Sequence, residues 1–237
     1  MKVGIMQPYF FPYIGYFSLI KNCDEYIVFD TPQFMRKGWI ERNRIIRRSG
    51  GSSYIKVPLI KAPVSTAINE MKINNDSLWK DKILAQLNVY KNKAPYYRIV
   101  LDIVKESLDG DFTHIADLNV NILKIVCSYL GIKTKISVYS CMDLQISPPK
   151  VADEWALNIC QALGASSYIN AEGGKNFFDR MKYTRNNVDL CFIKQGVSEY
   201  KQLGGKFEPN LSIIDVMMFN STLKIQKLLD DVSLLNE

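Results

Sequence analysis

Residues 2–30 read KVGIMQPYFFPYIGYFSLIKNCDEYIVFD. The stretch begins with the apolar run of a buried strand, which must end near Gln7 because the proline that follows has no backbone N–H for a sheet. Apolar residues at helical spacing come next, and residues 25–29 then have the character of a second strand. This order predicts a parallel strand pair with a right-handed crossover, whose ligands collect at the carboxyl ends of the strands. Gln7 and Asp30 follow those ends, so we expect both to line one cleft.

The rest of the chain continues to alternate between strand and helix patterns. Residues 77–130 are mainly amphipathic helix patterns, whereas strand patterns occur at 54–60, 132–140, 166–171 and 188–195. We therefore predict a single α/β domain over residues 1–237, with a mainly helical insert at 77–130. Its core is expected to be a Rossmann-like, open and mainly parallel sheet with helices on both faces.

The amino-acid composition indicates a globular protein and disfavours nucleic-acid-binding and membrane-spanning proteins. The chain has 237 residues, of which 47% are hydrophobic and 23% charged, as in an ordinary globular protein. A net charge of +6 suits an anionic substrate but is modest for a nucleic-acid binder, so no nucleic-acid partner is expected. No stretch approaches the ~18 apolar residues of a membrane span, and the N-terminus lacks the features of a signal peptide. We expect a cytoplasmic protein.

The cysteines and the single histidine indicate neither a disulfide framework nor a metal site. The five cysteines are scattered without a CxxC pair, which suits a reducing compartment. Each has apolar neighbours, which favours burial in the core over catalysis. One histidine cannot build a histidine-rich metal site, and no metal is expected.

The aromatic stretch at residues 7–17 is expected to be half core and half site. Three phenylalanines pack inward in this interpretation, namely Phe10, Phe11 and Phe17, and Tyr9 packs with them. The mouth of the cleft at the head of the first helix is then formed by Gln7, Tyr13, Gly15 and Tyr16. A glycine there lets an anion approach the free N–H groups and the positive end of the helix dipole. The alternative is a packed helix start with no ligand.

A basic and aromatic segment follows the second strand. We predict that it binds a phosphate or carboxylate through Lys37, Arg42 and Arg44, with Trp39 and Asn43 beside them. The alternative is a solvated charged surface.

Two later segments add candidates. Asn170 ends a predicted strand, and Gly173 and Gly174 follow at a helix start, where their amides either face a ligand or only form a tight turn. Asp215 lies in an apolar, helix-like run, where a carboxylate must be paired or hydrogen-bonded. It either caps or braces an arginine, or acts as a general base.

Several separated motifs resemble the WbqC-like family, which occurs in bacterial gene clusters for O-antigen and other surface polysaccharides. They are MQPYFFPYIGYFSLI, EYIVFD, QFMRKGWIERNRI, YKNKAPYY, SYINAEGGKNFF and FEPNLSIIDVMMFN, which together span nearly the whole chain. The resemblance implies transfer of glycine or a similar acyl group onto an amino sugar.

A second resemblance is to the nucleotidylyltransferase superfamily, and within it to pantothenate synthetases. The run from Tyr13 to Tyr16 stands where those enzymes have H-x-G-H at a helix start, and TPQF follows the second strand as their N-P-x-Q-F does. Tyrosines donate hydrogen bonds without supplying positive charge, which disfavours ATP-dependent adenylylation.

The two resemblances together imply an amide-forming acyl or aminoacyl transferase, or a ligase, that acts on a nucleotide-linked amino sugar. Asp30 or Asp215 is the candidate base, while Gln7, Tyr16 and Asn170 are the candidate donors to the oxyanion. The donor stays open between free glycine with ATP and an acyl-carrier-protein thioester. The first alternative is a non-catalytic module that binds a sugar nucleotide or a carrier protein. The last alternative is an active nucleotidylyltransferase, which the two tyrosines in place of histidines disfavour.

Overall fold

The computed structural model of the chain describes residues 1–196, 198–203 and 206–235. The strands are β1 (Lys2–Met6), β2 (Glu25–Val28), β3 (Arg42–Ile46), β4 (Ser52–Lys56), β5 (Lys135–Val138), β6 (Ser167–Ala171), β7 (Asp189–Gln195) and β8 (Val232–Leu235). The α-helices are α1 (Ile14–Lys21), α2 (Trp79–Gln86), α3 (Tyr97–Leu108), α4 (Ile115–Tyr129), α5 (Glu154–Ala162), α6 (Arg180–Arg185), α7 (Ile213–Phe219) and α8 (Thr222–Asp230). Short 3₁₀ helices are η1 (Ile68–Glu70), η2 (Leu87–Tyr90), η3 (Tyr139–Cys141) and η4 (Glu172–Gly174). None of these helices is long and apolar enough to cross a membrane.

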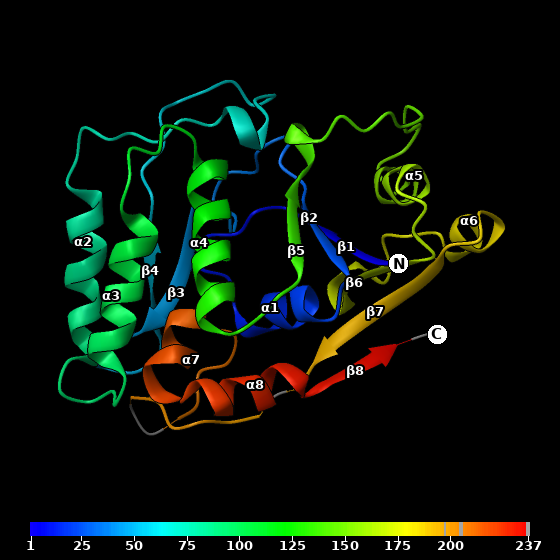
Figure 1. The fold of residues 1–237 in the computed structure, drawn as a ribbon. Helices are drawn as coiled ribbons and strands as arrows, with labels where there is room; N and C mark the ends of the chain where they lie inside the picture. Colours follow the sequence, from blue (N-terminus) through cyan, green and yellow to red (C-terminus); the bar gives the residue numbers. More distant parts are fainter. Residues whose placement is uncertain (197, 204–205, 236–237) are drawn as a thin grey trace.

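The six-stranded main sheet has the order β5-β2-β1-β6-β7-β8 (Figure 1). All neighbouring strands are parallel except β7 and β8, which pair antiparallel. The predicted β1-loop-α1-β2 unit is confirmed, with Met6 opposite Val28 in the parallel register. The sheet is therefore open, mainly parallel and Rossmann-like, as the sequence predicts.

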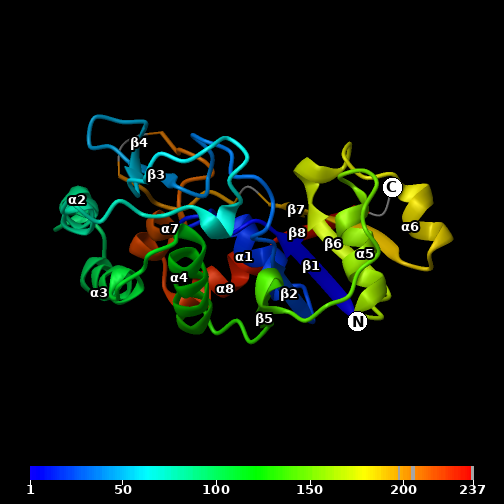
Figure 2. The same cartoon turned by 90° about the horizontal axis from the view of Figure 1, so that it is seen from above.

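Helices cover both faces of this sheet, because the strands place alternate apolar side chains on opposite faces. Tyr26 and Val28 of β2 belong to a large core with α1, α4, α7 and α8, whereas Ile27 belongs to a smaller core with α5 and α6. Seen from above, α5 and α6 lie on the opposite side of the sheet from α1 and α8 (Figure 2). Phe10, Phe11 and Phe17 are fully buried in the large core, which confirms their predicted packing role.

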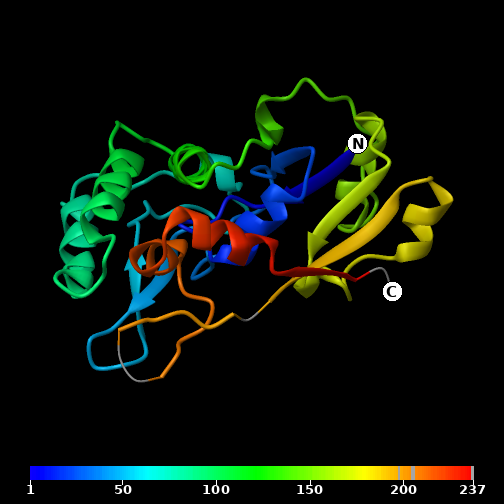
Figure 3. The ribbon, with the colours of Figure 1, turned by 60° about the horizontal axis from the view of Figure 1, so that its bottom comes forward.

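Residues 77–130 contain α2, α3 and α4, in agreement with the helical pattern of this part of the sequence. Helix α3 packs on α4, and α2 contacts strand β4 of the two-stranded β3-β4 hairpin (Figure 1). The basic segment of the sequence therefore forms a strand, β3, beside the helices. At the C-terminal end, α7 and α8 lead into β8, which runs alongside β7 (Figure 3).

The strand order reverses between β1 and β6. From β1 the chain proceeds through β2 to β5 on one side of the sheet, and β6 and β7 then form on the other side. The connections pack on different faces, α1 in the large core and α5 in the smaller one. Such a reversal opens a crevice at the carboxyl ends of the strands, which is the usual ligand position in doubly wound sheets.

Candidate functional site

A cavity of about 580 Å³ lies at this reversal, and we call it the switch-point cavity. Its walls come from the carboxyl ends of β1, β2 and β6, from helix α5 and from the segment after β6. Ligands of open parallel sheets bind at the carboxyl ends of the strands, which we call the strand-end rule, and the cavity lies at the position that this rule predicts from the sequence.

Four of the predicted binding residues meet in the switch-point cavity. Gln7 follows β1, Asn170 lies near the end of β6, and Gly173 and Gly174 form η4 directly after it. Both polar atoms of the Asn170 side-chain amide are hydrogen-bonded. The Nδ2 atom donates to the Tyr168 hydroxyl at 2.7 Å, and the Oδ1 atom accepts from the backbone N–H of Ala171 at 2.6 Å. The amide group is therefore fixed in orientation before any ligand arrives.

Aromatic side chains form most of the remaining wall. They are Tyr9, Phe29, Trp155, Tyr168, Phe177 and Phe178. Phe29 and Trp155 lie 5.4 Å apart between ring centroids, and Phe177 is 55% exposed. The sequence predicts packing for Tyr9 and does not indicate a site role for the other five. The pair of phenylalanines straight after the glycine turn was the available signal, because exposed aromatic residues beside a turn are typical of binding surfaces.

The cavity lining is uncharged. Among the described residues that form it, only tyrosines titrate, and burial raises the pKa of both Tyr9 and Tyr168. Their hydroxyls therefore stay protonated at neutral pH. Thr31 adds a buried hydroxyl oxygen without a hydrogen-bond partner. This lining suits a neutral ring with hydroxyl or amide groups better than a bare phosphate.

The expected role of the helix start is not supported by its geometry. Tyr16 is 1% exposed, and its hydroxyl donates to the backbone oxygen of Gln7 at 2.7 Å. A Cβ added to Gly15 would lie 2.5 Å from the ring of Tyr13, so that ring occupies the space predicted for a ligand. Neither tyrosine lines the cavity, because the helix turns Tyr16 toward β2, and burial raises its pKa far above the usual value.

Asp30 faces a second cavity of about 380 Å³, so the expectation that it shares one cleft with Gln7 is wrong. Successive side chains of an extended segment point to opposite sides, and here Phe29 and Thr31 face the switch-point cavity while Asp30 points away from it. Asp30 is 2% exposed, and its carboxylate accepts from the backbone N–H and the hydroxyl of Ser140, at 3.0 Å and 2.5 Å.

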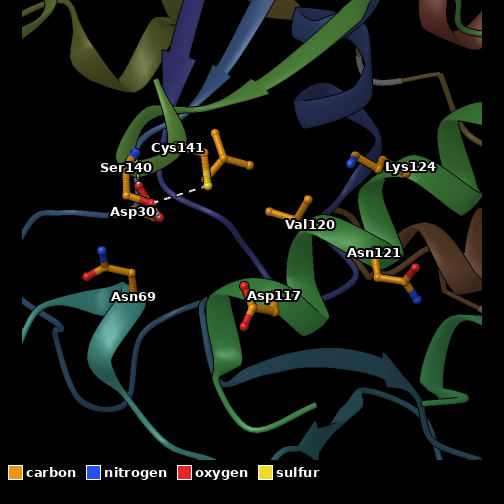
Figure 4. Close-up of a pocket in the computed structure, with 9 residues that line it drawn as sticks. Asp30, Asn69, Asp117, Val120, Asn121, Lys124, Ser140 and Cys141 are labelled. Carbon is orange, nitrogen blue, oxygen red and sulfur yellow. Dashed lines mark hydrogen bonds between the residues drawn. The ribbon is translucent and has the colours of Figure 1, made fainter. Parts of the chain in front are cut away.

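The second cavity also contains a thiol that the sequence analysis placed in the core. Figure 4 shows Cys141 beside Ser140 and Asp30, with Asp117, Asn121 and Lys124 of α4 across the cavity. Cys141 is exposed, unlike Cys23, Cys127 and Cys160, which are buried as predicted. It differs because it ends η3 at the carboxyl edge of the sheet, where it lines the second cavity and belongs to neither hydrophobic core.

Asp215 is part of a buried hydrogen-bond network in α7 and lines neither cavity. It is 0% exposed, and it accepts from the Tyr90 hydroxyl at 2.7 Å, the Tyr200 hydroxyl at 2.8 Å and the Gln202 amide at 2.9 Å. Burial raises its pKa, which the hydrogen bonds partly offset. Its described partners are two tyrosines and a glutamine, so the arginine expected beside it is not among them.

The basic segment does not reach the switch-point cavity either. Arg44 forms a 3.5 Å ion pair with Glu208, and its guanidinium lies 5.9 Å from the ring of Trp39. Asn43 is buried, and its amide donates to the backbone oxygens of Phe10 and Phe11, which holds the loop after β1. Lys37 is exposed, and its backbone oxygen accepts from the guanidinium of Arg42.

Comparison with known proteins places this arrangement in a family. The model of the WbqC-like protein family matches residues 7–227, which include the lining of the second cavity and all of the switch-point lining except Ile5 and Met6. The chain belongs to the WbqC-like protein family. It is also 31% identical over 222 residues to the uncharacterised protein Rv1507c of Mycobacterium tuberculosis, an alignment that covers 92% of this chain and 93% of that protein. No solved structure matches it.

Proposed function

We propose that this WbqC-like protein binds a nucleotide-linked amino sugar in the switch-point cavity and forms an amide on the sugar's amine, in the synthesis of a surface polysaccharide. The main support for the proposal is that Gln7, Asn170 and the Gly173-Gly174 turn line one cavity together with several aromatic side chains. Sugar and base rings stack on aromatic side chains, and amide groups pair with ring hydroxyls. The uncharged wall leaves the charged diphosphate at the solvent-exposed mouth of the cavity.

Amide formation requires a nucleophilic amine, an activated acyl group, hydrogen-bond donors to the oxyanion and an acceptor for the amine's proton. The amine nitrogen attacks the acyl carbonyl, the C–N bond forms, the bond from carbonyl to leaving group breaks, and the amine loses a proton. The Gln7 amide and the Gly173 and Gly174 N–H groups are the candidate donors to the oxyanion of the tetrahedral intermediate. Asp30, the base expected from the sequence, lies on the other side of residues 29–32 and does not face this amine, so the amine's proton passes through solvent to the leaving group.

The structure at the start of helix α1 favours one of the two candidate acyl donors. The ring of Tyr13 covers Gly15, and Tyr16 is buried, so α1 offers a triphosphate neither open N–H groups nor positive charge. This supports a donor that arrives already activated, as an acyl-carrier thioester, over free glycine with ATP.

Mass spectrometry of reaction mixtures tests the proposal. The protein is incubated with a UDP- or dTDP-amino sugar and either acyl-loaded carrier protein or glycine with ATP. We expect an acylated sugar nucleotide with the thioester, and loss of product in the Gln7→Ala and Asn170→Ala variants. Gln161→Ala is the matched control, because Gln161 is exposed on α5 and its amide bonds only to Asn186.

One observation favours a second candidate, a binding module without catalysis. The described residues of the switch-point cavity include no carboxylate, lysine or histidine that could take a proton from an amine. Binding of the sugar nucleotide that depends on Asn170, without product from either donor, would identify the protein as such a module. Absence of binding would exclude both candidates.

A further inference from the structure

The β3-β4 hairpin and helix α2 enclose a groove of about 700 Å³, separate from both cavities at the sheet edge, which we call the hairpin groove. One wall carries Tyr54, Lys56 and Leu59, and the other carries Leu78, Trp79 and Lys82. The Gln86 side chain donates to the backbone oxygen of Tyr54 at 3.0 Å and so ties α2 to the hairpin. The groove is therefore held open between two connected elements.

Positive charge is concentrated on the hairpin wall. Arg42 and Lys56 are direct partners in the antiparallel register, and like charges at such positions destabilise a strand pair. The nearest carboxylate is that of Glu41, which lies 3.5 Å from Lys56 and also accepts the backbone N–H of Lys37. Glu41 pairs with Lys56 but not with Arg42 among the described ion pairs, which leaves the Arg42–Lys56 pair with excess positive charge.

Arg42 contacts the ring of Tyr54, a residue of the groove wall, and so places a second positive charge near the groove. Its guanidinium lies 4.2 Å from the centroid of Tyr54, whose ring lines the groove. Its Nε is buried without a hydrogen-bond acceptor, and in the part of the chain that the structure describes it has no ion-pair partner. The half-buried guanidinium donates through Nη2 to the backbone oxygen of Lys37, which holds it beside Tyr54 while its charge keeps no described carboxylate partner.

The opposite wall combines charge with apolar surface. Lys82 of α2 lines the groove, and no described carboxylate pairs with it. Leu78 beside it is 81% exposed and adds apolar surface to this wall. Trp79 is fixed by its indole N–H, which donates to Asn75 at 3.0 Å. The groove therefore pairs a cationic end with an apolar side.

We infer that the hairpin groove binds the phosphate of an ester whose other part is apolar, with Lys56 and Lys82 on the phosphate and Leu78 and Trp79 against the apolar part. Arg42 strengthens the field through Tyr54. The inference does not rest on the proposed function, because it involves no residue of the switch-point cavity. Two sources have this chemistry, a soluble phosphate ester with an apolar chain and a phospholipid headgroup.

Calorimetry with inorganic phosphate and hexyl phosphate tests the site. We expect hexyl phosphate to bind more tightly than phosphate, and the Lys82→Ala variant to weaken its binding about tenfold or more, as for loss of a charge-assisted contact. Lys105→Ala is the control, because Lys105 is an exposed lysine of the neighbouring α3 that pairs with Asp102 outside the groove. Raising the salt concentration should weaken binding further, since exposed charges are screened.

Vesicle sedimentation separates the two sources. Binding to phosphatidylcholine vesicles that contain phosphatidic acid, lost in Lys82→Ala and kept in Lys105→Ala, would assign the phosphate to a lipid. Binding of hexyl phosphate without vesicle binding would assign it to a soluble ester. Equal effects of the two substitutions, or a wild-type protein that binds neither hexyl phosphate nor vesicles, would overturn the inference.

Discussion

The carboxylate of Asp30 is bound by one residue, Ser140, through both its backbone N–H at 3.0 Å and its hydroxyl at 2.5 Å. Asp30 follows β2 and Ser140 lies in η3 after β5, so the pair ties the carboxyl ends of two neighbouring strands together. This contact closes one side of the second cavity and keeps the Asp30 side chain out of the switch-point cavity.

The Asp30–Ser140 pair gives the first prediction. Ser140→Ala removes one donor from a buried carboxylate, and we expect it to lower the free energy of unfolding by about 1–3 kcal/mol in urea denaturation. Asp30→Asn should also lower stability but leave sugar-nucleotide binding unchanged, because this carboxylate lies outside the switch-point cavity. Asp117→Asn is the control, because this exposed carboxylate lines the same cavity. Weaker sugar-nucleotide binding in Asp30→Asn, with normal binding in Asp117→Asn, would contradict this placement of Asp30.

A second prediction concerns the network around Asp215. Asp215→Ala leaves the Tyr90 and Tyr200 hydroxyls and the Gln202 amide without their acceptor, so we expect a loss of roughly 3 kcal/mol of stability. The Tyr90→Phe variant should cost less, because the carboxylate keeps two of its donors. Urea denaturation of both variants measures the difference, and equal losses would show that the three bonds do not act together.

The pH dependence of the same group is a third prediction. Burial raises the pKa of Asp215 above its value of 3.8 in the unfolded chain, so the folded protein binds this proton more tightly. Its contribution to stability is present below 3.8 and is lost as the pH rises through the folded pKa. The stability of the wild type relative to Asp215→Asn should therefore increase as the pH falls through this range. A relative stability that increases with rising pH would contradict the raised pKa.

Close packing at the centre of the sheet gives a fourth prediction. A Cβ added to Gly4 in β1 would lie 2.5 Å from the sulfur of Cys23 and 3.3 Å from the ring of Tyr26. Gly4→Ala should therefore destabilise the protein by about 1–3 kcal/mol through overpacking. Cys23→Ala removes the nearer atom, so the double variant should be more stable than the sum of the two single effects predicts. Additive losses in denaturation would show that the clash is relieved elsewhere.

The sequence predicts the centre of the fold well, because local patterns and the strand-end rule both act there. The apolar run of β1, the proline after Gln7 and the second strand define the parallel pair, and the same rule brings Gln7 and Asn170 into one cavity. These features depend on chain order and burial, which a single sequence contains.

Side-chain direction is where prediction from the sequence fails. Asp30 is one residue from the cavity wall, and the alternation of an extended segment turns it to the other side. Tyr16 faces the core because of its position on the turn of α1. Arg44 finds Glu208, a partner 164 residues away along the chain, which no local pattern indicates. The aromatic wall is missed for a similar reason, since it gathers residues from four separate segments.

The glycine turn beside Asn170 gives the last prediction. A Cβ added to Gly174 would lie 3.1 Å from Phe178 and 3.3 Å from the Asn170 amide nitrogen, whereas one added to Gly173 meets nothing within 4 Å. Gly174→Ala should therefore push the Asn170 amide from its hydrogen bond to Tyr168. We expect sugar-nucleotide affinity to fall roughly 3- to 10-fold in calorimetry, the effect of one uncharged hydrogen bond.

Two comparisons make this prediction specific. Adding Gly174→Ala to Asn170→Ala should weaken binding no further, because both changes remove the same amide from the cavity wall. Gly173→Ala should leave the free energy of unfolding unchanged within about 0.5 kcal/mol, since its methyl group displaces no side chain. If Gly174→Ala lowers affinity as strongly without the Asn170 amide as with it, the turn acts on the ligand directly, through its own backbone, and Asn170 is not the residue that it positions.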